Sequence, residues 1–266
     1  MSYLVAQISD FHIVERDQLL LDAIDSAAFL RAAVDHLNRL DPSPDVVVAT
    51  GDLVNDGRPA QYANLRELLA PLHYPLRLVP GNHDDRDALR AAFPDHGEVG
   101  TDGFVDYVVD GPVRVVVLDS TRFPEPGGCL DDGQLAWLDD TLAQAPGTPT
   151  IVAVHHPPFL TGIEHMDAMG FDPSSAAALG EVIDRHPQVE RVQCGHLHRS
   201  ITTRWHGTTA ATAPGVAHAV ALDLQGGPAA WNREPPACVL HWWTPATGLV
   251  SHVQAIGTYP ATRYQD

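Results

Sequence analysis

The segment LRLVPGNHDD, residues 76–85, joins two kinds of sequence. Three of its first four residues are apolar, as in short strands that are buried in a sheet. A proline and a glycine end this run, and the polar side chains of Asn82, His83 and Asp84 follow at once. An apolar strand that ends in polar side chains is typical of layered α/β proteins, which bind their ligands at the carboxyl ends of strands.

Four other apolar runs end in the same way. They are Tyr3–Ile8, followed by Asp10 and His12; Val46–Ala49, followed by Gly51 and Asp52; Ile151–Val154, followed by His155 and His156; and Val189–Cys194, followed by Gly195, His196 and His198. Because the carboxyl ends of strands meet at one crevice in such a fold, we expect these side chains to lie together. The glycines at 51, 81 and 195 suit a chain that leaves a strand sharply, which requires positive φ or a close backbone approach.

Between the apolar runs lie segments whose apolar residues recur at helical spacing. This alternation of strands and helices predicts a layered α/β domain. The predicted helices are Ala27–Leu40, Gln61–Leu69, Arg86–Ala92, Asp131–Ala143 and Ser174–Arg185, and a further strand is predicted at Val113–Leu118. After residue 200 the sequence favours strands alone, at Ser200–Trp205, Ala217–Leu224, Cys238–Trp243 and Leu249–Ile256. Glycines and prolines mark a long loop at 225–236, which we expect to be a disordered surface excursion or an oligomer contact.

The composition excludes several kinds of chemistry. The 266 residues include 15 histidines but no lysine, and the net charge is −18. Without lysine the chain offers neither Schiff-base catalysis nor the phosphate loop of nucleotide triphosphatases. Its acidic character disfavours duplex nucleic acid as a partner. No run approaches the ~20 apolar residues of a membrane span, so no membrane association is expected.

Cysteine usage and the start of the chain predict a cytoplasmic location. Cys129, Cys194 and Cys238 are odd in number and lack Cys-x-x-Cys spacing, so we expect neither a disulfide framework nor a zinc ribbon. Residues 1–10 lack the basic start and long apolar stretch of a signal peptide.

The side chains at the strand ends are carboxylates, an amide and imidazoles, with no thiolate among them. Such donors suit Fe, Mn, Zn or Co and not a copper–thiolate or iron–sulfur centre. Seven candidate ligands exceed what one cation needs if positions are to stay open for water and substrate. The sequence therefore favours two divalent metal ions that share a carboxylate.

In their order along the chain, these strand-end residues resemble the motif set of the calcineurin-like metallophosphoesterases. The matching strings are Asp10-x-His12, Gly51-Asp52, Gly81-Asn82-His83-Asp84, His155, and Gly195-His196-x-His198. Residues 80–84, His155-His156-Pro157-Pro158, Met166-Asp167 and Pro214–His218 further resemble the class III cyclic nucleotide phosphodiesterases, and the bacterial glycerophosphodiesterases in particular. The resemblance implies a four-layer αββα sandwich, with residues 1–200 as catalytic core and the β-rich residues 201–266 completing the second sheet and forming a small cap or oligomer contact.

The resemblance also implies a role for each candidate residue. Asp10, His12 and His198 would hold one metal, Asn82, His155 and His196 the other, and Asp52 would bridge them. A hydroxide supplied by the two cations would attack phosphorus, while His83 stabilises the transition state or protonates the leaving group. The expected substrate contacts are Asn82, His83, His156, Met166, Asp167 and His218, with the loop 159–171 as the rim of the site; His156 also has packing as an alternative.

The implied reaction is hydrolysis of small phosphodiesters, either glycerophosphodiesters or 3′,5′-cyclic nucleotides. The candidate ligands face metal and phosphate, so they do not distinguish between the two substrate classes. A phosphomonoesterase or phosphonate monoester hydrolase, and a non-catalytic metal-binding scaffold, remain alternatives. Trp231, Trp242 and Trp243 suggest a surface that is covered in a homodimer or larger homo-oligomer.

Overall fold

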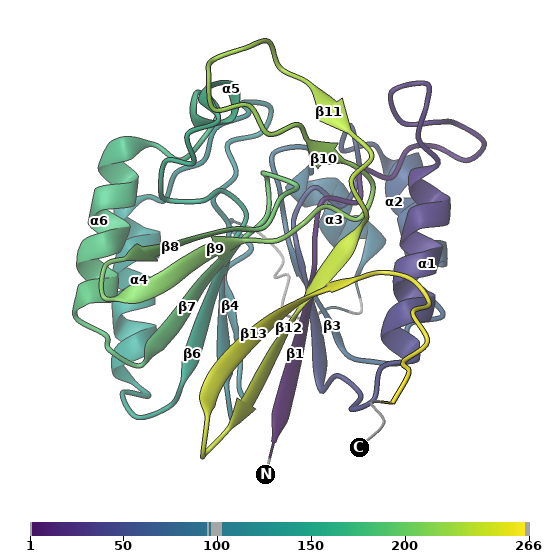
Figure 1. Cartoon of the computed structure of the whole chain (residues 1–266). Coiled ribbons are helices and arrows are strands. Elements are labelled where there is room, and N and C mark those ends of the chain that lie inside the picture. Colours follow the sequence, from purple (N-terminus) through teal and green to yellow (C-terminus); the bar gives the residue numbers. More distant parts are fainter. Residues whose placement is uncertain (1, 95, 97–102, 264–266) are drawn as a thin grey trace.

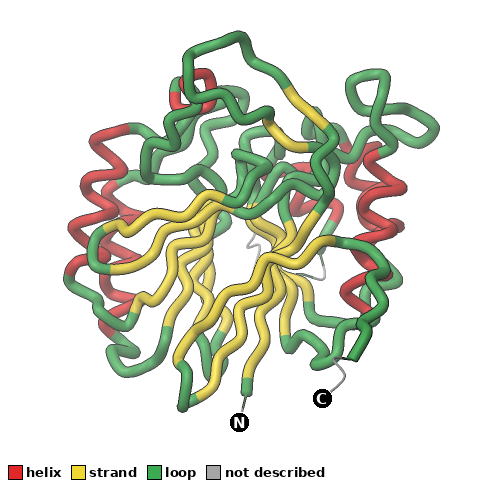
Figure 2. Tube along the Cα trace, viewed as in Figure 1, coloured by secondary structure: helices red, strands yellow, loops and turns green. Residues whose placement is uncertain are grey.

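Two β-sheets pack face to face at the centre of the protein, and helices cover the outer face of each (Figure 1). The computed structural model describes residues 2–94, 96 and 103–263. Figure 2 shows the strands gathered in the middle and the helices on the two sides. The four-layer order of helices, sheet, sheet and helices that the sequence predicts is confirmed.

The first sheet has the strand order β13-β12-β1-β2-β3. These strands are β1 (Tyr3–Ile8), β2 (Val46–Thr50), β3 (Leu76–Val79), β12 (Ala237–Thr244) and β13 (Gly248–Ala255). The first three run parallel to one another, and β12 joins β1 antiparallel. The helices on this side are α1 (Ser26–Asn38), α2 (Pro59–Leu69) and α3 (Arg86–Ala92).

The second sheet has the strand order β4-β5-β6-β7-β9-β8. Its strands are β4 (Tyr107–Val109), β5 (Arg114–Leu118), β6 (Thr150–Val154), β7 (Val189–Cys194), β8 (Ile201–Trp205) and β9 (Thr208–Thr212). From β5 to β7 and on to β9 the strands are parallel. The helices α4 (Asp132–Ala143) and α6 (Pro173–Asp184) cover this sheet, and the short α5 (Glu164–Asp167) lies above it (Figure 1).

The apolar core has two layers that follow from the alternation of side chains along a strand. In β5, Val115 and Val117 pack in a cluster that contains residues of the first sheet, whereas Val116 and Leu118 pack with residues of α4 and α6. Both faces of this strand are buried, which explains why Val115–Leu118 is uniformly apolar.

Aspartates start four of the helices. The carboxylates of Asp25, Asp85, Asp131 and Asp172 each accept a hydrogen bond from a backbone N–H in the first turn. This N-cap satisfies a donor that has no partner within the helix. Part of the acidic excess of the chain therefore has a structural use.

The predicted elements up to residue 194 are confirmed to within about two residues at their ends. The C-terminal part differs more. Of the strand predicted at Ala217–Leu224 only β10 (Ala219–Val220) forms, and it pairs with β11 (Trp231–Asn232) in a separate two-stranded sheet. The strands β8 and β9 extend the second sheet, but β12 and β13 extend the first, so residues after 200 contribute to both sheets.

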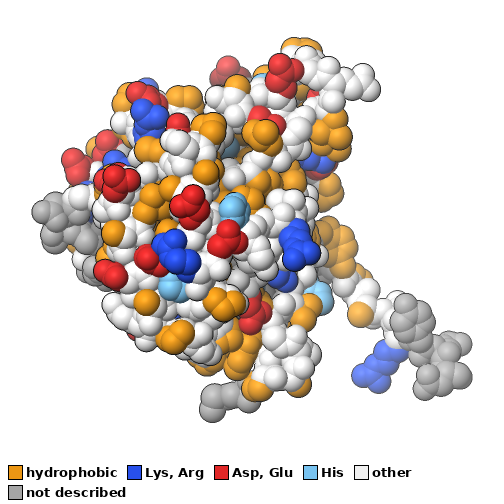
Figure 3. Space-filling model, turned by 90° about the vertical axis from the view of Figure 1, so that its left-hand side faces the viewer, with side chains coloured by type: hydrophobic (Ala, Val, Ile, Leu, Met, Phe, Trp, Pro, Cys, Tyr) orange, Lys and Arg blue, Asp and Glu red, His pale blue; other side chains and the backbone are white. Residues whose placement is uncertain are grey.

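No helix in the described ranges is long and apolar enough to cross a lipid bilayer. On the face drawn in Figure 3, arginine side chains are interspersed with acidic ones and do not gather into a basic patch.

Candidate metal centre

The seven candidate ligands lie at the carboxyl ends of strands from both sheets. Asp10 and His12 follow β1, Asp52 follows β2, Asn82 follows β3, His155 follows β6, and His196 and His198 follow β7. Backbone hydrogen bonds tie these segments together, with N–H groups of the β1 segment donating to carbonyls of the β2 segment and Gly195 donating to the carbonyl of His155. The site therefore spans the seam between the two sheets.

Asp10, His12, Asp52 and His198 form the first group. Each offers one nitrogen or oxygen atom, and these atoms lie within 4.8 Å of one another. The Nε2 atoms of His12 and His198 are 3.2 Å apart, and His12 Nε2 lies 3.4 Å from Asp52 Oδ2. All four side chains are buried.

Asn82, His155 and His196 form the second group. Asn82 Oδ1 lies 3.1 Å from Nε2 of His155 and 3.0 Å from Nδ1 of His196. Asp52 joins the two groups, because its Oδ1 lies 3.4 Å from His155 Nε2 while its Oδ2 faces His12. The structure thus brings all seven candidate ligands together.

The hydrogen bonds made by the ring nitrogens that face away from the site indicate whether the site suits cations. Nδ1 of His155 donates to the carbonyl of Thr50 at 2.8 Å, so in the neutral ring Nε2 turns a lone pair toward the oxygens of Asn82 and Asp52. Nδ1 of His198 donates to the carbonyl of His218 at 3.3 Å, so its Nε2 likewise points inward as an acceptor. Acceptors that face acceptors repel unless a positive charge lies between them. The donor set therefore fits divalent cations.

Buried polar atoms without hydrogen-bond partners also indicate a cation site. Asp10 Oδ2 and His196 Nε2 are buried and have no hydrogen-bond partner among the described residues. An unpaired buried carboxylate oxygen is costly in a protein interior. A cation beside Asp10 would remove that cost.

In the protein alone, the ionisable groups respond strongly to one another. Burial raises the pKa of Asp10 to about 7. Burial would also raise the pKa of Asp52, but the imidazoles of His155 and His83 hold it well below its usual range. Burial opposes a charge on His155, yet the carboxylate of Asp52 raises its pKa to about 9. The carboxylates thus attract a positive charge to the centre of the site.

Five of the seven candidate ligands have a left-handed backbone. The φ angles are 58° at Asp10, 45° at His12, 51° at Asp52, 69° at His196 and 50° at His198. Residues with a side chain rarely adopt this conformation, and its clustering is typical of functional sites.

The predicted need for glycine next to the ligands is confirmed. Gly51 has a φ of 96°, and a Cβ atom there would collide with the ring of His155. At Gly81 a Cβ atom would collide with the backbone nitrogen and Oδ1 of Asp52.

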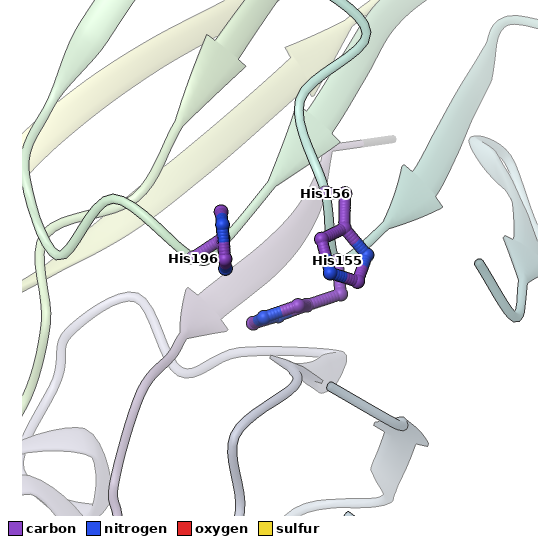
Figure 4. A group of neighbouring side chains, drawn as sticks. All are labelled: His155, His156 and His196. Carbon is purple, nitrogen blue, oxygen red and sulfur yellow. The ribbon is translucent and has the colours of Figure 1, made fainter. Parts of the chain in front are cut away.

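His156 lies close to the second group, but its ring is already engaged. Figure 4 shows His155 and His156 on neighbouring positions of one segment, with His196 opposite. The ring of His156 accepts from the hydroxyl of Ser120 at Nδ1, at 2.8 Å, and donates to the carbonyl of Pro126 at Nε2, at 3.0 Å. Its side chain is 0% exposed. Both ring nitrogens have these protein partners, which favours the packing alternative over a substrate contact, and the ring packs against those of His155 and His196. One ring nitrogen from each of the three histidines lies within 4.8 Å of the others.

His83 lies beside both groups. Its backbone N–H donates to Asp52 Oδ1 at 3.0 Å, and its Nδ1 donates to the carbonyl of Asn55 at 2.6 Å. Its ring meets the ring of His12 edge to face, with centroids 4.7 Å apart. Burial would lower the pKa of His83, but the Asp52 carboxylate and the Asn55 carbonyl raise it.

Asp84 has a structural role that the sequence did not reveal. Its carboxylate accepts from the backbone of Gly81, Leu53 and Val54 and from the hydroxyl of Tyr62. It thereby joins the segments after β2 and β3, which carry Asp52 and Asn82. The signal in the sequence was an acidic residue directly after the polar cluster at the end of a strand.

The residues predicted at the substrate rim fall into two classes. Met166 is buried in a small apolar cluster with Ile163, Leu197 and Val220. Asp167 accepts hydrogen bonds from Thr161 and Gly162 of its own loop. These contacts give both residues structural roles in the loop.

His218, in contrast, faces the first group. Its ring centroid lies 4.4 Å from that of His198 and 5.5 Å from that of His12. Its Nδ1 is buried and has no partner among the described residues. It is therefore the predicted rim residue with a ring atom still free beside the candidate ligands.

Comparison with known proteins agrees with this geometry. Residues 3–200 match the family model described as calcineurin-like phosphoesterase. A probable glycerophosphodiester phosphodiesterase of Arcobacter nitrofigilis is 34% identical over 96% of this chain and 94% of its own, and a probable cyclic nucleotide phosphodiesterase of Rhodopseudomonas palustris is 37% identical over 86% of this chain and 84% of its own. A dimetal phosphatase from Danio rerio has the same fold, with a TM-score of 0.63 at 18% identity, covering 96% of this chain and 99% of that one. The chain therefore belongs to the calcineurin-like phosphoesterase family.

Proposed function

We propose that this protein is a metal-dependent hydrolase of small phosphodiesters. The observation that carries the proposal is the pair of acceptor groups that share Asp52 at the seam of the two sheets. Membership of a family that uses dinuclear metal centres supports it. So do relatives of similar length that are named as phosphodiesterases.

In this proposal each group of side chains holds one divalent cation. Asp10, His12 and His198 hold the first, Asn82, His155 and His196 hold the second, and Asp52 lies between them. Two such cations, when bound, would lower the pKa of water in the site and neutralise negative charge on phosphoryl oxygens. Fe, Mn, Zn and Co all suit these nitrogen and oxygen donors.

His83 then acts as the general acid that protonates the leaving group. The hydrogen bond from its Nδ1 to the Asn55 carbonyl fixes the ring and leaves Nε2 as the atom that can deliver a proton. Burial would lower the pKa of His83, but the Asp52 carboxylate and the Asn55 carbonyl raise it, which favours the protonated ring that a general acid needs. Asn82 and His218 orient the phosphate from either side of the centre.

Replacement of His83 tests this role. His83→Ala is expected to retain its metal, because the candidate ligands remain in place, and to lose about 10²- to 10⁴-fold in kcat, as is typical when a general acid is removed. Metal content is measured by elemental analysis and kcat with bis(p-nitrophenyl) phosphate. Full activity of His83→Ala would show that its ring takes no part in the reaction.

The proposed substrates are glycerophosphodiesters and 3′,5′-cyclic nucleotides, the two classes named for the relatives of this chain. A panel of glycerophosphoethanolamine, cyclic AMP and a phosphomonoester, compared by kcat/KM with the metal-loaded protein, tests this. We expect turnover of at least one diester at a higher kcat/KM than the monoester. A fully metallated protein that cleaves no diester would refute the proposal and favour a non-catalytic scaffold.

We also propose an arrangement for the whole chain, with residues 1–200 as the catalytic core and 201–266 as a β-rich part that completes the sheets and contacts a second copy. The open edge of β13, the outermost strand of the first sheet, supports a homodimer or larger homo-oligomer. Light scattering at micromolar concentration tests it, and a monomer there would contradict it. A cytoplasmic location is proposed as well, on the basis of three cysteines that remain free thiols.

A further inference from the structure

Trp231 presents an indole to solvent at the rim of the metal centre. It is 39% exposed, although tryptophan is the side chain that gains most from being covered by an apolar or aromatic surface. It lies in β11, on the excursion after β10, and Figure 1 shows this two-stranded sheet above the carboxyl ends of the central strands.

The position of Trp231 is fixed relative to a candidate ligand. In the two-stranded sheet Trp231 is opposite Val220, whose carbonyl accepts from the guanidinium of Arg199 at 2.8 Å. Arg199 directly follows His198 in the chain and also pairs with Glu234, three residues beyond Trp231, at 2.9 Å. On the other side, Arg233 donates to the carbonyl of Ala23. The indole is therefore held on a braced support.

A series of rings leads from the first group of ligands to this indole. The centroid of His218 lies 4.4 Å from that of His198 and 6.1 Å from that of Trp231, and the His218 and Trp231 planes are 84° apart. Trp231 is the outermost ring of the series and the one with a large exposed surface. A group attached to a phosphate at the metal centre would meet it next.

We propose that Trp231 is a specificity-determining residue that stacks against the base of a 3′,5′-cyclic nucleotide whose phosphate lies at the metal centre. This inference rests on the proposed phosphodiesterase function and assigns one substrate class to the site. In a cyclic nucleotide the phosphate and the base are attached to the same furanose ring, so a base projects at a fixed distance from phosphorus. The flat base then covers the exposed indole.

The alternative substrate class does not stack on the indole. Glycerophosphodiesters present no flat surface to the ring, although an ethanolamine or choline ester carries an ammonium group that can lie over it, so the discriminating comparison uses a diester of an uncharged alcohol, glycerophosphoglycerol. Stacking against tryptophan does not depend on which base is present, because every base has a π-face. Trp231 is thus expected to favour cyclic nucleotides in general.

Steady-state kinetics of the metal-loaded protein test the proposal. Trp231→Ala is expected to raise KM for cyclic AMP by about tenfold, in line with loss of one stacked base, while kcat stays within about twofold. KM for glycerophosphoglycerol, whose alcohol groups carry neither a base nor an ammonium, is expected not to change. Trp231→Phe keeps an aromatic face and restores most of the affinity for cyclic AMP. The matched control is Leu222→Ala, which removes another exposed apolar side chain from the same excursion and should leave both substrates unaffected.

A binding measurement gives a readout that does not depend on turnover. The adenosine 3′,5′-cyclic phosphorothioate, a slowly hydrolysed analogue, should quench part of the indole emission of the wild-type protein. In Trp231→Phe the analogue should still bind, as followed by calorimetry, but without that part of the quenching.

The outcomes separate this inference from the proposed function. If Trp231→Ala weakens both substrates equally, the indole acts only by holding His218 in place, and the stacking proposal is wrong. If cyclic AMP kinetics and analogue binding are unchanged in Trp231→Ala, it is also wrong. If the wild-type protein cleaves no phosphodiester at all, the proposed function fails instead, whatever the analogue shows.

Discussion

At the scale of single residues, the metal centre depends on backbone conformations that are unfavourable in isolation. A left-handed conformation at a residue with a side chain costs roughly 1–2 kcal/mol. Five candidate ligands adopt it, and the backbone hydrogen bonds between their segments hold them there. The folded protein therefore keeps the ligands in place before any cation arrives, which reduces the ordering that binding requires.

Gly81 offers a direct test of this preorganisation. In Gly81→Ala the new Cβ atom would collide with the backbone nitrogen and Oδ1 of Asp52. We expect this variant to lose most of its bound metal and about 10²-fold in activity, because even a small misplacement of reacting groups is costly. Gly147→Ala is the matched control, since a Cβ atom there has no neighbour within 4 Å. Normal metal content in Gly81→Ala would show that Asp52 can move without loss.

Individual residues also mark the limit of what the sequence predicts. The order of acidic, amide and imidazole residues after five strands is enough to predict that the seven candidate ligands lie together. In contrast, the resemblance assigned His155 to a metal but left both substrate contact and packing open for His156. The hydrogen bonds of His156 to Ser120 and Pro126, which are distant in sequence, hold its ring in the interior. The burial of Met166 likewise depends on Leu197 and Val220, which are distant in sequence.

At the scale of elements, the helix α2 supports the segment that carries Asn82 and His83. Tyr62 of α2 is fully buried, donates to Asp84 Oδ1 at 2.9 Å and accepts from the backbone N–H of Asp85 at 3.0 Å. One hydroxyl group thus fixes the start of α3 and the carboxylate that joins two ligand segments.

Tyr62→Phe is expected to destabilise the protein by about 1–3 kcal/mol, because a buried carboxylate and a backbone donor each lose a partner while the volume of the side chain is kept. Urea denaturation measures the change. Tyr74→Phe serves as the control, since the hydroxyl of Tyr74 has no hydrogen bond within the described part of the chain and its ring packs at the edge of the same core. Equal stability of the two variants would show that Asp84 finds other partners.

Elements with a strong local pattern of apolar and turn residues could be predicted from the sequence. Elements whose position depends on contacts between residues far apart in the chain could not. The strands β1, β3 and β7 match the predicted ranges because each is a short, largely or half apolar segment that ends at the polar cluster with its glycine or turn residues. The two-stranded sheet β10–β11 differs, because its strands are two residues long and are separated by an excursion without a repeating pattern. Its position is set by Arg199 and Glu234, whose pairing cannot be read from the local sequence.

At the scale of the whole molecule, metal binding should stabilise the fold. A cation that binds only the native state, at 100 to 1,000 times its dissociation constant, adds about 3–4 kcal/mol. For a chain of this size that corresponds to roughly 10 °C in Tm. We expect a chelator to lower Tm by about this amount, as measured by differential scanning calorimetry. Asp52→Asn, which lacks the shared carboxylate, should respond far less, and an identical response of both proteins would contradict a metal site at Asp52.

A buried histidine remote from the ligands should make the fold sensitive to acid. His241 of β12 hydrogen-bonds to Ser251 and Gln7, and burial, with a smaller effect of Arg191, lowers its pKa to about 3. In the unfolded chain its pKa is about 6.5. Between these values only the unfolded state binds the proton, so stability that is present above about pH 6.5 is lost as the pH falls.

The expected loss from His241 is about 2 kcal/mol between pH 7 and pH 5. Urea denaturation of wild type and His241→Gln at both pH values measures it. The variant should lose about that much less on acidification, even if it is less stable at pH 7. If the free energy of unfolding falls equally in both proteins between pH 7 and pH 5, His241 does not contribute to the acid sensitivity of the fold.

The candidate ligands are far apart in the sequence, from Asp10 to His198, and this has a consequence for synthesis of the protein. The first group needs Asp10, His12 and His198 together, and the second needs His196 in addition to Asn82 and His155. A growing chain on the ribosome therefore has no complete cation pocket until about three quarters of its residues have been joined. Metal loading must follow translation of almost the entire catalytic part, and any shorter nascent or truncated chain leaves its carboxylates and imidazoles without the cations that suit them.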